Sequence, residues 1–517
     1  MKPPTPVRLI RKRILIVNAF FDDLRINGPN PNKIPQAMGP VYLAGAFSQD
    51  SCEVRIYNEH YSGPLEDAAL LGWPDMLLLT GLSVAFDRML HLTAYARTKN
   101  PEVIVVAGGP AIRALSDYSQ KYFDYSCLGD IEQIGDVIVD ALGRDYLAET
   151  MIPRYDLMRH FSALGYIETS RNCNFKCTFC SLTGEGSGYQ QYSLENIRQQ
   201  VCAMDKKHHV VLIDNNFYGN DRSFFLSRLE LLAELREQGY FRGWSALVSG
   251  DFFARDDNLA LARNAGCESL FSGLESFDSE LLRQYNKRQN TILPQVDIIR
   301  KCRQAGIVFT YGIMLDLSRR RIAEIRSEVD FILTNPEITL PSFFSLTIPL
   351  LGTPYFDECA KNGALLPNLR LRDLDGYTIT TVPLDPIEEA VSLVRDLPSL
   401  KGYRRKALAK GLGYIHHNWR RLSSIQKGIV MTNVLLLCMP RLNNNPTGLR
   451  LRSPPRTHIG GREVLDSVYT PAFKVDSKFQ SFFNPTMVTD AAGQPTRLLD
   501  VVSPVSAVTD ILATEVR

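Results

Sequence analysis

Residues 168–182, ETSRNCNFKCTFCSL, are the stretch from which the rest of the chain can be interpreted. They place Cys173, Cys177 and Cys180 in a C-x3-C-x2-C spacing at the end of a strand-like run. A loop this short can wrap three thiolates around one inorganic centre. Structural zinc usually takes four protein ligands, and no paired-cysteine or histidine motif accompanies these three. A cubane 4Fe-4S cluster held by three cysteines leaves one iron without a protein ligand, and such an iron is open to substrate chemistry.

The other seven cysteines argue against a disulfide framework. They are scattered singly in apolar contexts, which predicts core packing, at positions 52, 127, 202, 267, 302, 359 and 438. Ten cysteines in so long a chain are too few for a disulfide scaffold, and the cluster itself holds an odd number. The three clustered thiols therefore require a chemical explanation of their own.

Length and composition favour a folded chain with several domains. The 517 residues are 45% hydrophobic, 22% charged and 9% aromatic, close to the averages for globular proteins. At roughly 100 to 200 residues per domain, about three domains are expected. The longest apolar run, 428–440, is interrupted by Thr432 and Asn433 and falls short of the ~20 residues that span a bilayer. No signal peptide is visible at the start, so a cytoplasmic location is predicted.

The residues before the cysteine loop alternate β-rich runs with amphipathic segments. This alternation predicts an α/β, Rossmann-like, doubly wound parallel sheet at 1–150. The β-rich runs are 14–17, 54–57, 76–79, 103–107 and 125–128. Small and polar residues follow several of these runs, where ligands of such sheets bind. The same glycines would also serve tight turns, and the sequence alone leaves both readings open.

A second alternating series covers the cysteine loop and the residues after it. Its six candidate strands are 166–169, 210–213, 244–248, 269–274, 308–314 and 344–348. Six βα units at these spacings predict a partial (β/α)6 barrel of the TIM type at 155–365, with an open doubly wound sheet as the alternative. A mixed or helical C-terminal domain is expected at 366–517, with a helix at 386–396, irregular or strand-like structure at 369–383 and loop at 443–461.

The cysteine loop resembles the signature of the radical S-adenosylmethionine (SAM) enzymes, C-x3-C-x-aromatic-C, with Phe179 as the aromatic residue. The resemblance implies that Cys173, Cys177 and Cys180 hold a 4Fe-4S cluster whose open iron chelates the amino and carboxylate groups of SAM. It also implies that Phe179 packs near the adenine. As residues considered alone, the three thiols could serve another metal, and Phe179 could be an ordinary loop aromatic.

Three further stretches extend the resemblance across about 160–360. Asp214 follows the second strand of the barrel series, where the family places polar groups facing the methionyl part of SAM. Glu275 and Ser276 end the fourth strand in a G-x-E-S pattern that directs a carboxylate and a hydroxyl toward SAM. The run 347–354, TIPLLGTP, resembles a P-x-x-G-T-P stretch of the cobalamin-containing relatives. Taken singly, the two acids could equally be helix caps or solvated loop residues.

A Rossmann-like domain ahead of this barrel resembles the cobalamin-binding branch of the superfamily. The resemblance implies that Ser83, Gly108 and Gly109 lie where the nucleotide tail of the corrin approaches the backbone. The expected D-x-H-x-x-G motif is missing, because residues 18–32 contain no histidine, and His60 is interpreted as a surface or core residue. A domain that binds nothing is the alternative. The G-x-G-x-x-G fingerprint of nicotinamide cofactors does not follow any of these strands.

The resemblance implies an enzyme that cleaves SAM reductively and, with cobalamin, methylates an unactivated carbon. Hopanoid-like lipids or tetrapyrroles would be the hydrophobic substrates, and an external donor such as flavodoxin or ferredoxin would supply electrons. Rearrangement, cyclisation or oxygenation without methyl transfer is the alternative chemistry. A non-catalytic iron-sulfur redox protein is the alternative of another class.

The C-terminal third carries an uneven charge. No acidic residue occurs between Asp396 and Glu463, and 13 Lys or Arg residues lie in 401–462. Basic residues interleaved with aromatic and aliphatic ones favour peripheral contact with a membrane surface through 401–440. A solvated basic helix is the alternative, and no nucleic acid is expected because no binding module accompanies the charge.

Overall fold

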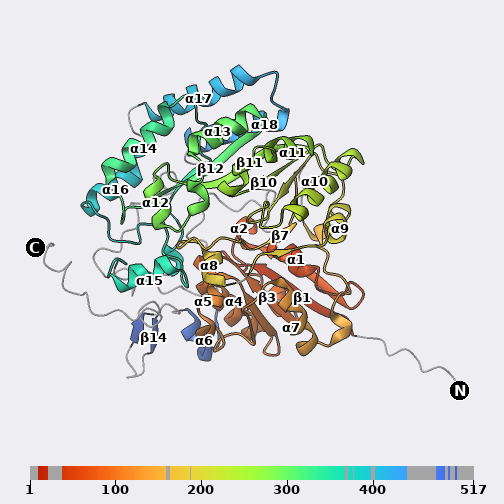
Figure 1. Cartoon of the computed structure of the whole chain (residues 1–517). Helices are drawn as coiled ribbons and strands as arrows, with labels where there is room; N and C mark the ends of the chain where they lie inside the picture. The colour runs from red at the N-terminus through yellow and green to blue at the C-terminus, as the bar shows by residue number, and fades with distance from the viewer. Residues whose placement is uncertain are drawn as a thin grey trace, which may run out of the picture. The chain divides into compact units, whose positions relative to one another are not determined.

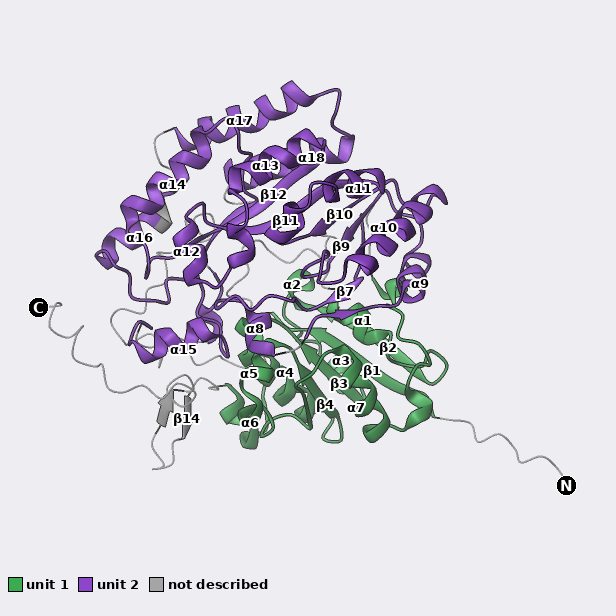
Figure 2. Ribbon diagram, viewed as in Figure 1, with its two compact units in different colours: residues 1–161, 467–498 green, residues 162–466, 499–517 purple. Residues whose placement is uncertain are grey.

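The computed structural model describes residues 10–20, 38–158, 164–186, 188–366, 369, 371–376, 378–397, 402–438, 473–483, 487–489 and 495–497. The chain divides into two compact units, coloured separately in Figure 2: unit 1 comprises residues 1–161 and 467–498, and unit 2 comprises 162–466 and 499–517. Each unit is described by itself. The division into domains at 1–150, 155–365 and 366–517 stays a prediction. The loop expected at 443–461 lies outside the described residues.

Unit 1 contains a five-stranded parallel sheet in the order β2-β1-β3-β4-β5 (Figure 1). Its strands are β1 (Lys12–Asn18), β2 (Cys52–Asn58), β3 (Met76–Thr80), β4 (Ile104–Gly108) and β5 (Tyr125–Cys127). The strand order reverses between β1 and β3, which is the switch point beside which doubly wound sheets bind ligands. The expected Rossmann-like sheet is therefore confirmed, with the predicted strands in place.

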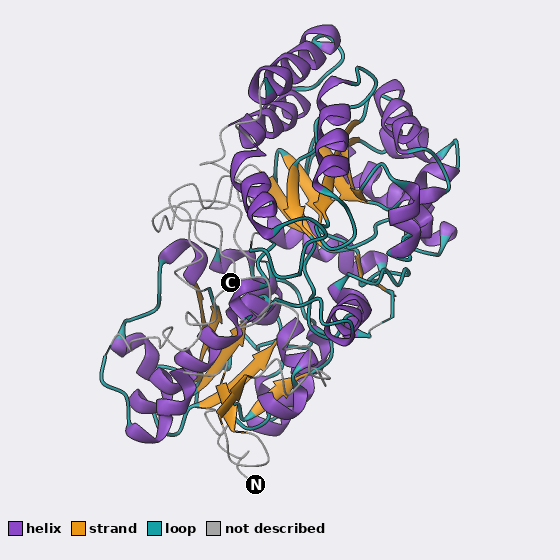
Figure 3. Cartoon of the chain, turned by 90° about the vertical axis from the view of Figure 1, so that its left-hand side faces the viewer, coloured by secondary structure: helices purple, strands orange, loops and turns teal. Residues whose placement is uncertain are grey.

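Apolar residues explain why these strands form the centre of unit 1. Four consecutive residues of β1, Ile14 to Val17, are fully buried, as strands covered on both faces by helices require. The helices are α1 (Gly39–Ala44), α2 (Glu59–Ser62), α3 (Ala68–Gly72), α4 (Phe86–Lys99), α5 (Pro110–Ala114), α6 (Ser116–Ser119) and α7 (Ile134–Ala141). Figure 3 shows the helices outside the strands.

A segment from the far end of the chain completes unit 1. The 3-10 helix η11 (Ser477–Phe483) packs on α4, where Phe483 stacks on His91 with ring centroids 5.0 Å apart. Phe473 lies 4.5 Å from the ring of Tyr95 on the same helix. Strands β14 (Met487–Thr489) and β15 (Pro495–Arg497) pair antiparallel beyond it. Residues near the C-terminus thus belong to the core of the N-terminal sheet unit.

Unit 2 contains a six-stranded, wholly parallel sheet in the order β13-β12-β11-β10-β9-β6. Its strands are β6 (Leu164–Ile167), β9 (His209–Leu212), β10 (Gly243–Leu247), β11 (Cys267–Glu275), β12 (Val308–Leu315) and β13 (Phe343–Leu346). The sequential strand order is that of a barrel series, and the six strands agree with those expected. The partial (β/α)6 barrel is confirmed.

The helices of unit 2 begin where capping residues occur in the sequence. Ser193 and Asp221 accept hydrogen bonds from the first-turn amides of α9 and α10, as N-caps do. The helices are α8 (Ser181–Glu185), α9 (Leu194–Met204), α10 (Arg222–Glu237), α11 (Asn258–Asn264), α12 (Ser279–Gln284), α13 (Gln295–Gln304), α14 (Ile322–Thr334), α15 (Pro354–Lys361), α16 (Ile387–Asp396), α17 (Tyr403–Asn418) and α18 (Ser424–Cys438). None of the described helices is long and apolar enough to cross a bilayer.

The predicted C-terminal elements are partly as expected. The helix expected at 386–396 is α16, and the described part of the basic segment 401–440 contains α17 and α18. The stretch 369–383 holds a single 3-10 turn, Leu371–Asp373, and one isolated bridge between Leu365 and Thr381, so its described residues are largely irregular. Helices α17 and α18 of unit 2 pack against each other. Helix α17 also contacts α14, and α18 contacts strands β11, β12 and β13.

Candidate functional site

The cysteine loop follows the short strand β7 (Ser170–Arg171) and is fixed by backbone hydrogen bonds at its middle. The amide of Thr178 donates to the carbonyl of Tyr285 at 2.9 Å, and the amide of Tyr355 donates to the carbonyl of Thr178 at 3.0 Å. Cys177 is buried, whereas Cys173 and Cys180 are partly exposed. Two tyrosines from distant helix ends therefore hold the loop in place.

Side chains close the remaining turns of this loop. The hydroxyl of Thr183 donates to the carbonyl of Cys177 at 2.8 Å, and the amide of Asn286 donates to the carbonyl of Lys176 at 2.8 Å. Asn172, just before the first cysteine, adopts a left-handed backbone with φ of 62°, which asparagine tolerates better than most residues. The loop is thus shaped before any metal binds.

The three thiols lie close enough to affect one another's ionisation. Burial raises the pKa of Cys180 to about 11, and the neighbouring Cys177 and Cys173 act in the same direction. Burial likewise raises the pKa of Cys173. Metal binding has to remove these protons, because the thiolate is the ligand.

The donor set fits an iron-sulfur cluster by its chemistry. All ten cysteines lie in described segments and are free thiols. Among the described residues, no three His, Cys, Asp or Glu side chains are arranged around one metal-ion position. Thiolates of a cubane each bind a separate iron, unlike the ligands of a single ion. Of the seven cysteines expected in the core, Cys202 is instead exposed and Cys127 half-buried, because Cys202 lies on the outer face of α9.

A buried ion pair lies beside the thiols. Lys287 donates to Glu275 at 2.7 Å, and the two side chains are only 11% and 12% exposed. Burial by itself lowers the pKa of Lys287, but Glu275 and Cys177 outweigh it, so the net pKa is raised and the ammonium stays charged. The same ammonium lies 5.4 Å from the centre of the Phe179 ring. Lys287 is therefore close to Glu275, Phe179 and the thiols together.

Glu275 occupies a strained backbone position. The register between β11 and β12 shifts at Gly273/Glu275, and Glu275 has a φ of 65°, which costs about 1–3 kcal/mol for a residue with a side chain. A Cβ at Gly273 would collide with the Glu275 carboxylate, so the glycine leaves room for the ion pair. The bulge turns the carboxylate toward Lys287.

A polar bridge joins the ends of β10 and β11. Asn290 donates to the carbonyl of Gly273 at 2.7 Å and accepts from the amide of Gly250 at 3.2 Å. Gln289, its neighbour in η7 (Arg288–Thr291), donates to the sulfur of Cys177 at 3.4 Å. The same short segment thus positions a cysteine and the strained end of β11.

Several of these residues were missed by sequence reasoning. Asp251 follows β10 and raises the pKa of Cys173 by its charge, while burial raises its own pKa. The Ser249-Gly250-Asp251 run at a strand end was a usable signal, since the other strand ends had been examined for such residues. Lys287 and Gln289 gave no signal, because they lie in an irregular segment that only the tertiary structure brings to the cysteines.

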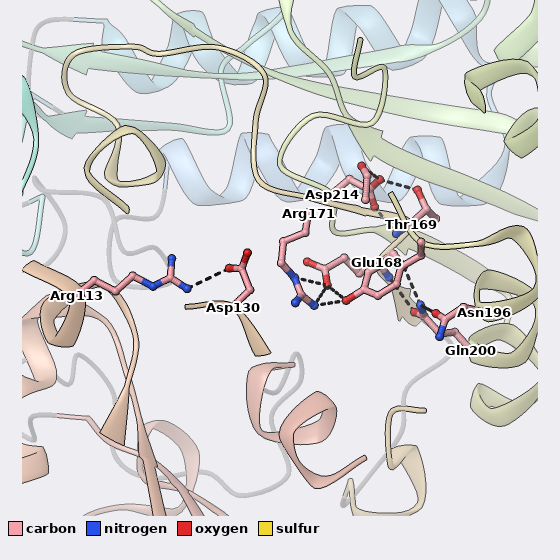
Figure 4. Close-up of polar contacts among 10 residues, drawn as sticks. Arg113, Asp130, Glu168, Thr169, Arg171, Asn196, Gln200 and Asp214 are labelled. Atoms are coloured by element: carbon pink, nitrogen blue, oxygen red, sulfur yellow. Dashed lines mark hydrogen bonds and ion pairs between the residues drawn. The ribbon is translucent and has the colours of Figure 1, made fainter. Parts of the chain in front are cut away.

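Asp214 lies in a fully buried network (Figure 4). Its carboxylate accepts from the amide of Thr169 at 2.7 Å, from the hydroxyl of Ser170 at 2.5 Å and from Arg228 at 3.2 Å. Arg228 also donates to the carbonyl of Phe217. Asp214 therefore fixes the two residues that lead into the cysteine loop, and direct contact with SAM stays a prediction.

A second network in Figure 4 holds the same strand end from its other side. Arg171 pairs with Glu168 at 2.6 Å, and Tyr192 donates to the same carboxylate at 3.2 Å. Gln200 of α9 both accepts from the amide of Glu168 at 3.1 Å and donates to its carbonyl at 2.9 Å. The start of the cysteine loop is thereby anchored to α9.

Ser276, the other residue of the G-x-E-S pattern, is fully buried and faces α14. Its hydroxyl donates to Glu328 at 2.6 Å, and Glu328 in turn pairs with Arg320. The hydroxyl also accepts from the amide of Asp278, which caps α12. The structure gives Ser276 a positioning role in the turn after β11, and contact with SAM stays a prediction.

Asn216, after β9, points at the cysteine loop. Its amide donates to the side chain of Asn174 at 2.7 Å, while its own buried carbonyl oxygen has no partner among the described residues. Asn174 lies between the first two cysteines. A buried acceptor without a donor costs about 1–3 kcal/mol, and functional sites are where such atoms persist.

An aromatic cluster at the end of β12 packs behind Phe179. The rings of Phe179 and Tyr285 are 5.1 Å apart, and Tyr285 donates to the buried carboxylate of Asp316. Tyr355 also reaches Asp316, at 3.3 Å, and Arg319 lies over both tyrosine rings at 5.2 and 5.0 Å. Burial first, and Asp316 second, keep the pKa of Tyr285 well above its usual value.

The 347–354 stretch packs on the helix that follows the cysteines. Gly352 has a φ of 75°, Thr353 caps α15 and Pro354 is its first residue. A Cβ at Gly184 of α8 would lie 2.6 Å from the carbonyl oxygen of Gly352. This close approach places the stretch against the cysteine loop and accounts for its glycine, threonine and proline.

In unit 1 the two expected glycines lie at the end of β4, against the residues that follow β3. Gly109 has a φ of 117°, and a Cβ there would lie 2.8 Å from the carbonyl oxygen of Gly81. Gly108 ends β4, and Ser83 is buried in the 3-10 helix that follows β3. The loops after β3 and β4 therefore pack closely on each other, and the glycine at 109 is required by this contact and by its positive φ.

Two ion pairs fix the same edge. Glu59 pairs with Arg88 at 2.7 Å in the core of unit 1 and accepts from the amide of Phe20 at 3.0 Å. Arg113 pairs with Asp130 at 3.1 Å, joining the loops after β4 and β5 (Figure 4). His60 packs on the ring of Phe20 at 4.4 Å and is half-buried. Most of the loop expected to carry a histidine motif lies outside the described residues.

Part of the chain, including the cysteine loop, matches a known family. Residues 167–326 match the family model of the Radical SAM superfamily. Similar curated proteins include the hopanoid C-2 methylase of Rhodopseudomonas palustris (strain TIE-1), 25% identical over 400 residues and covering 72% of each chain. Another is the bacteriochlorophyllide d C-12(1)-methyltransferase of Chlorobaculum tepidum, 22% identical over 354 residues, or 62% of this chain and 74% of that protein.

Solved structures share the fold. One is the radical S-adenosylmethionine methyltransferase TsrM from Kitasatospora setae with cobalamin and 4Fe-4S cluster bound, with a TM-score of 0.51, 16% identity, and coverage of 70% of this chain and 77% of that one. Another is the cobalamin-dependent S-adenosylmethionine radical enzyme OxsB, with a TM-score of 0.54, 13% identity, and coverage of 83% and 75%. The expected α/β class and the resemblance of the cysteine loop are confirmed.

Proposed function

We propose that this chain, which carries a radical SAM domain over residues 167–326, is a cobalamin-dependent C-methyltransferase of hydrophobic substrates. One observation carries the proposal: three neighbouring thiols on one loop lie beside a buried, oppositely charged pair, Glu275 and Lys287. A thiol set alone would suit any metal protein. A carboxylate and an ammonium next to it suit a zwitterionic ligand.

The protein groups divide the binding work. Cys173, Cys177 and Cys180 would hold the 4Fe-4S cluster, which when bound supplies the electron that cleaves SAM to a carbon radical. Glu275 would accept hydrogen bonds from the SAM ammonium, and Lys287 would donate to its carboxylate, each exchanging its present partner for the ligand. Phe179, whose ring centre lies 5.4 Å from the Lys287 ammonium, would offer an aromatic face for the adenine.

Asp214 and Ser276 would act indirectly, by positioning other residues of the site. Asp214 orders the backbone at Thr169 and Ser170, and Ser276 orders the turn that presents Glu275. Pre-organised loops lower the cost of bringing reactants together, which is where such residues contribute. We further propose that the side chains of Asp214 and Ser276 rearrange when SAM binds and then hydrogen-bond to it directly.

We propose that unit 1 binds cobalamin at the ends of β3 and β4. Ser83, Gly108 and Gly109 would face it, because they lie at the carboxyl ends of β3 and β4, the edge at which doubly wound sheets bind ligands. Cobalamin when bound supplies a methyl group on cobalt. The names of TsrM and OxsB support this proposal, since both are cobalamin proteins with this fold.

The substrate class is proposed from the relatives' names. Two are named for hopanoid and bacteriochlorophyllide substrates, both of which are hydrophobic and polycyclic. Leu408 and Leu412 of α17 and its C-cap residue Trp419 are 40%, 49% and 59% exposed, and the ammonium of Lys427 lies 3.9 Å from the Trp419 ring. We propose a cytoplasmic protein that touches an anionic membrane surface through this part of 401–440, and that takes electrons from a flavodoxin- or ferredoxin-like donor.

The test is a single-turnover assay under anaerobic conditions. The reconstituted protein is mixed with SAM and a strong reductant, and 5'-deoxyadenosine and S-adenosylhomocysteine are measured together. Both products in the presence of cobalamin are expected of a methyltransferase. Deoxyadenosine without S-adenosylhomocysteine would favour rearrangement, cyclisation or oxygenation. Neither product under any reducing condition would favour a non-catalytic redox protein.

A further inference from the structure

A cavity of about 250 Å³ lies far along the barrel sheet from the cysteine loop. Residues of α17, α18, the end of α13 and the segment before β13 line it. Val308, which lines it, is the first residue of β12, whereas the cysteines follow the last residues of β6 and β7. In a parallel sheet these are opposite edges, so the cavity is separate from the site described above.

The charged lining of this cavity is entirely basic. Arg303, Lys410 and His417 line it, and no Asp or Glu does. Arg303 forms no ion pair with any acidic residue that the structure describes. The ammonium of Lys410 donates to the carbonyls of Asn335, at 2.6 Å, and Ile332, which are neutral acceptors at the end of α14. A ligand that neutralises these groups has to be an anion.

The remaining wall is mostly apolar. Its larger aliphatic members are Val308, Ile338, Leu340 and Val430, and its uncharged polar members are Thr339, Tyr414, Asn418 and Asn433. Burial of the Lys410 side chain lowers its pKa to about 8, which still leaves most of the ammonium charged at pH 7. An anion followed by a short hydrocarbon chain would satisfy both parts of the wall.

Two glycines of α17, Gly411 and Gly413, line the cavity, and they have different structural roles. A Cβ at Gly411 would strike the side chain of Val434, so this glycine allows α17 and α18 to pack. A Cβ at Gly413 would meet no atom within 4 Å, although Gly413 lines the cavity. Glycine within a helix costs about 1 kcal/mol relative to alanine, and packing does not account for it at 413.

We propose that this cavity binds a single-chain anionic amphiphile, with its carboxylate or phosphate at the basic residues and its first methylenes along the aliphatic wall. Its volume lies just below the usual range of small-molecule sites, about 300–1,000 Å³, so the chain inside is short. The site is distinct from the proposed reaction centre, and its ligand would act as an effector or a structural lipid of α17 and α18.

The test is calorimetric titration of the full chain, without SAM or cluster, with decanoate, decyl phosphate and the neutral control decanol. At least one anion is expected to bind with a Kd below about 1 mM, and decanol at least about tenfold more weakly. A stronger decyl phosphate would identify a phosphate headgroup, and a stronger decanoate a fatty acid. Equal binding of decanol, or no binding of either anion, would overturn the proposal.

Matched glycine variants localise the binding. Gly413→Leu fills the cavity and is expected to weaken anion binding at least tenfold. Gly428→Leu on α18 is the control, because its Cβ also meets nothing within 4 Å but Gly428 does not line the cavity. Both replacements favour helix, so folding should be retained. Unchanged binding in Gly413→Leu, or equal loss in both variants, would overturn the assignment, and neither result bears on the methyltransferase proposal.

Discussion

At the scale of single residues, the Glu275–Lys287 pair combines burial, charge and strain. The pair lies within reach of the cysteine loop, and the carboxylate is presented by a residue in a left-handed backbone conformation. Neither charge is tolerated in the interior without the other or a ligand that replaces it. This exchangeable pairing is what a site for a zwitterion requires.

Breaking the pair from one side should be more harmful than removing it whole. We expect Glu275→Gln and Lys287→Met each to destabilise the apo chain by about 3–5 kcal/mol, because each leaves a buried charge unpaired. The double variant should lose clearly less than the sum. Calorimetric melting of the three variants measures this, and additivity within about 0.5 kcal/mol would show that the two groups do not interact.

The next prediction concerns iron binding by the cysteine loop. Cys177→Ala should lose most of the iron and the visible absorption of the reconstituted chain, because a cubane with two protein ligands is poorly held. Cys302→Ala is the control, since Cys302 is equally buried but lies on α13. Iron content and EPR of the reduced proteins give the readout. Full iron retention in Cys177→Ala would rule out the proposed ligand set.

Substitution of Asp214 distinguishes a structural role of its carboxylate from direct contact with SAM. We expect Asp214→Asn to lower the melting temperature of the chain without SAM, because Arg228 then loses its buried counter-charge. The loss should be about as large as in Arg228→Met. If the variant melted like the wild type and only its SAM affinity fell, the carboxylate would contact SAM directly, as the sequence had suggested.

At the scale of elements, the site depends on close packing between segments that are distant in the sequence. Helix α8 approaches the 347–354 stretch at Gly184 and Gly352, and the cysteine loop hydrogen-bonds to residues at the ends of α12 and α15. Close packing of this kind leaves no space for an added methyl group. The loop geometry is therefore set by its neighbours.

Gly184→Ala tests this packing. Alanine normally stabilises a helix by about 1 kcal/mol over glycine, but here its methyl would contact the Gly352 carbonyl, so we expect a net loss of stability and weaker cluster retention. Gly428→Ala, a helical glycine with free space around it, should instead gain stability. Melting temperatures and iron content of the two proteins are compared. A stabilised Gly184→Ala would contradict the contact.

At the scale of the whole molecule, two compact units carry the two proposed cofactors separately. The cysteines and Glu275 belong to unit 2, and Ser83, Gly108 and Gly109 belong to unit 1. Segment 473–483 returns to unit 1, so each unit contains residues that are distant in the chain. Truncation at any residue from 366 to 472 would therefore remove part of unit 1 as well.

Because the two cofactors are proposed to bind to different units, we expect the chain to bind either cofactor without the other. Gly109→Ala places a methyl against the Gly81 carbonyl at a φ that favours glycine, so we expect weaker cobalamin binding, measured by corrin absorption after gel filtration. The same variant should retain its iron, and Cys177→Ala should retain cobalamin. Loss of both cofactors in either single variant would show that the sites are coupled.

Sequence periodicity was sufficient to predict the strands. All eleven strands of the two parallel sheets overlap the runs expected from the sequence, because a buried parallel strand is a short, continuous apolar run bounded by turn residues. The cysteine loop was found for a similar reason: its spacing is local. Capping residues such as Ser193 and Asp221 also act on neighbours within one turn.

What the sequence by itself determined is therefore the order of elements and the loop that holds the thiols, since both depend on residues close together in the chain. Only the tertiary structure decided which polar groups meet there. Gln289 reaches Cys177 across 112 residues, and Asp214 turns to Arg228 within a buried network. The pairing of buried charges follows from which groups are desolvated together, and this is a property of the packed chain.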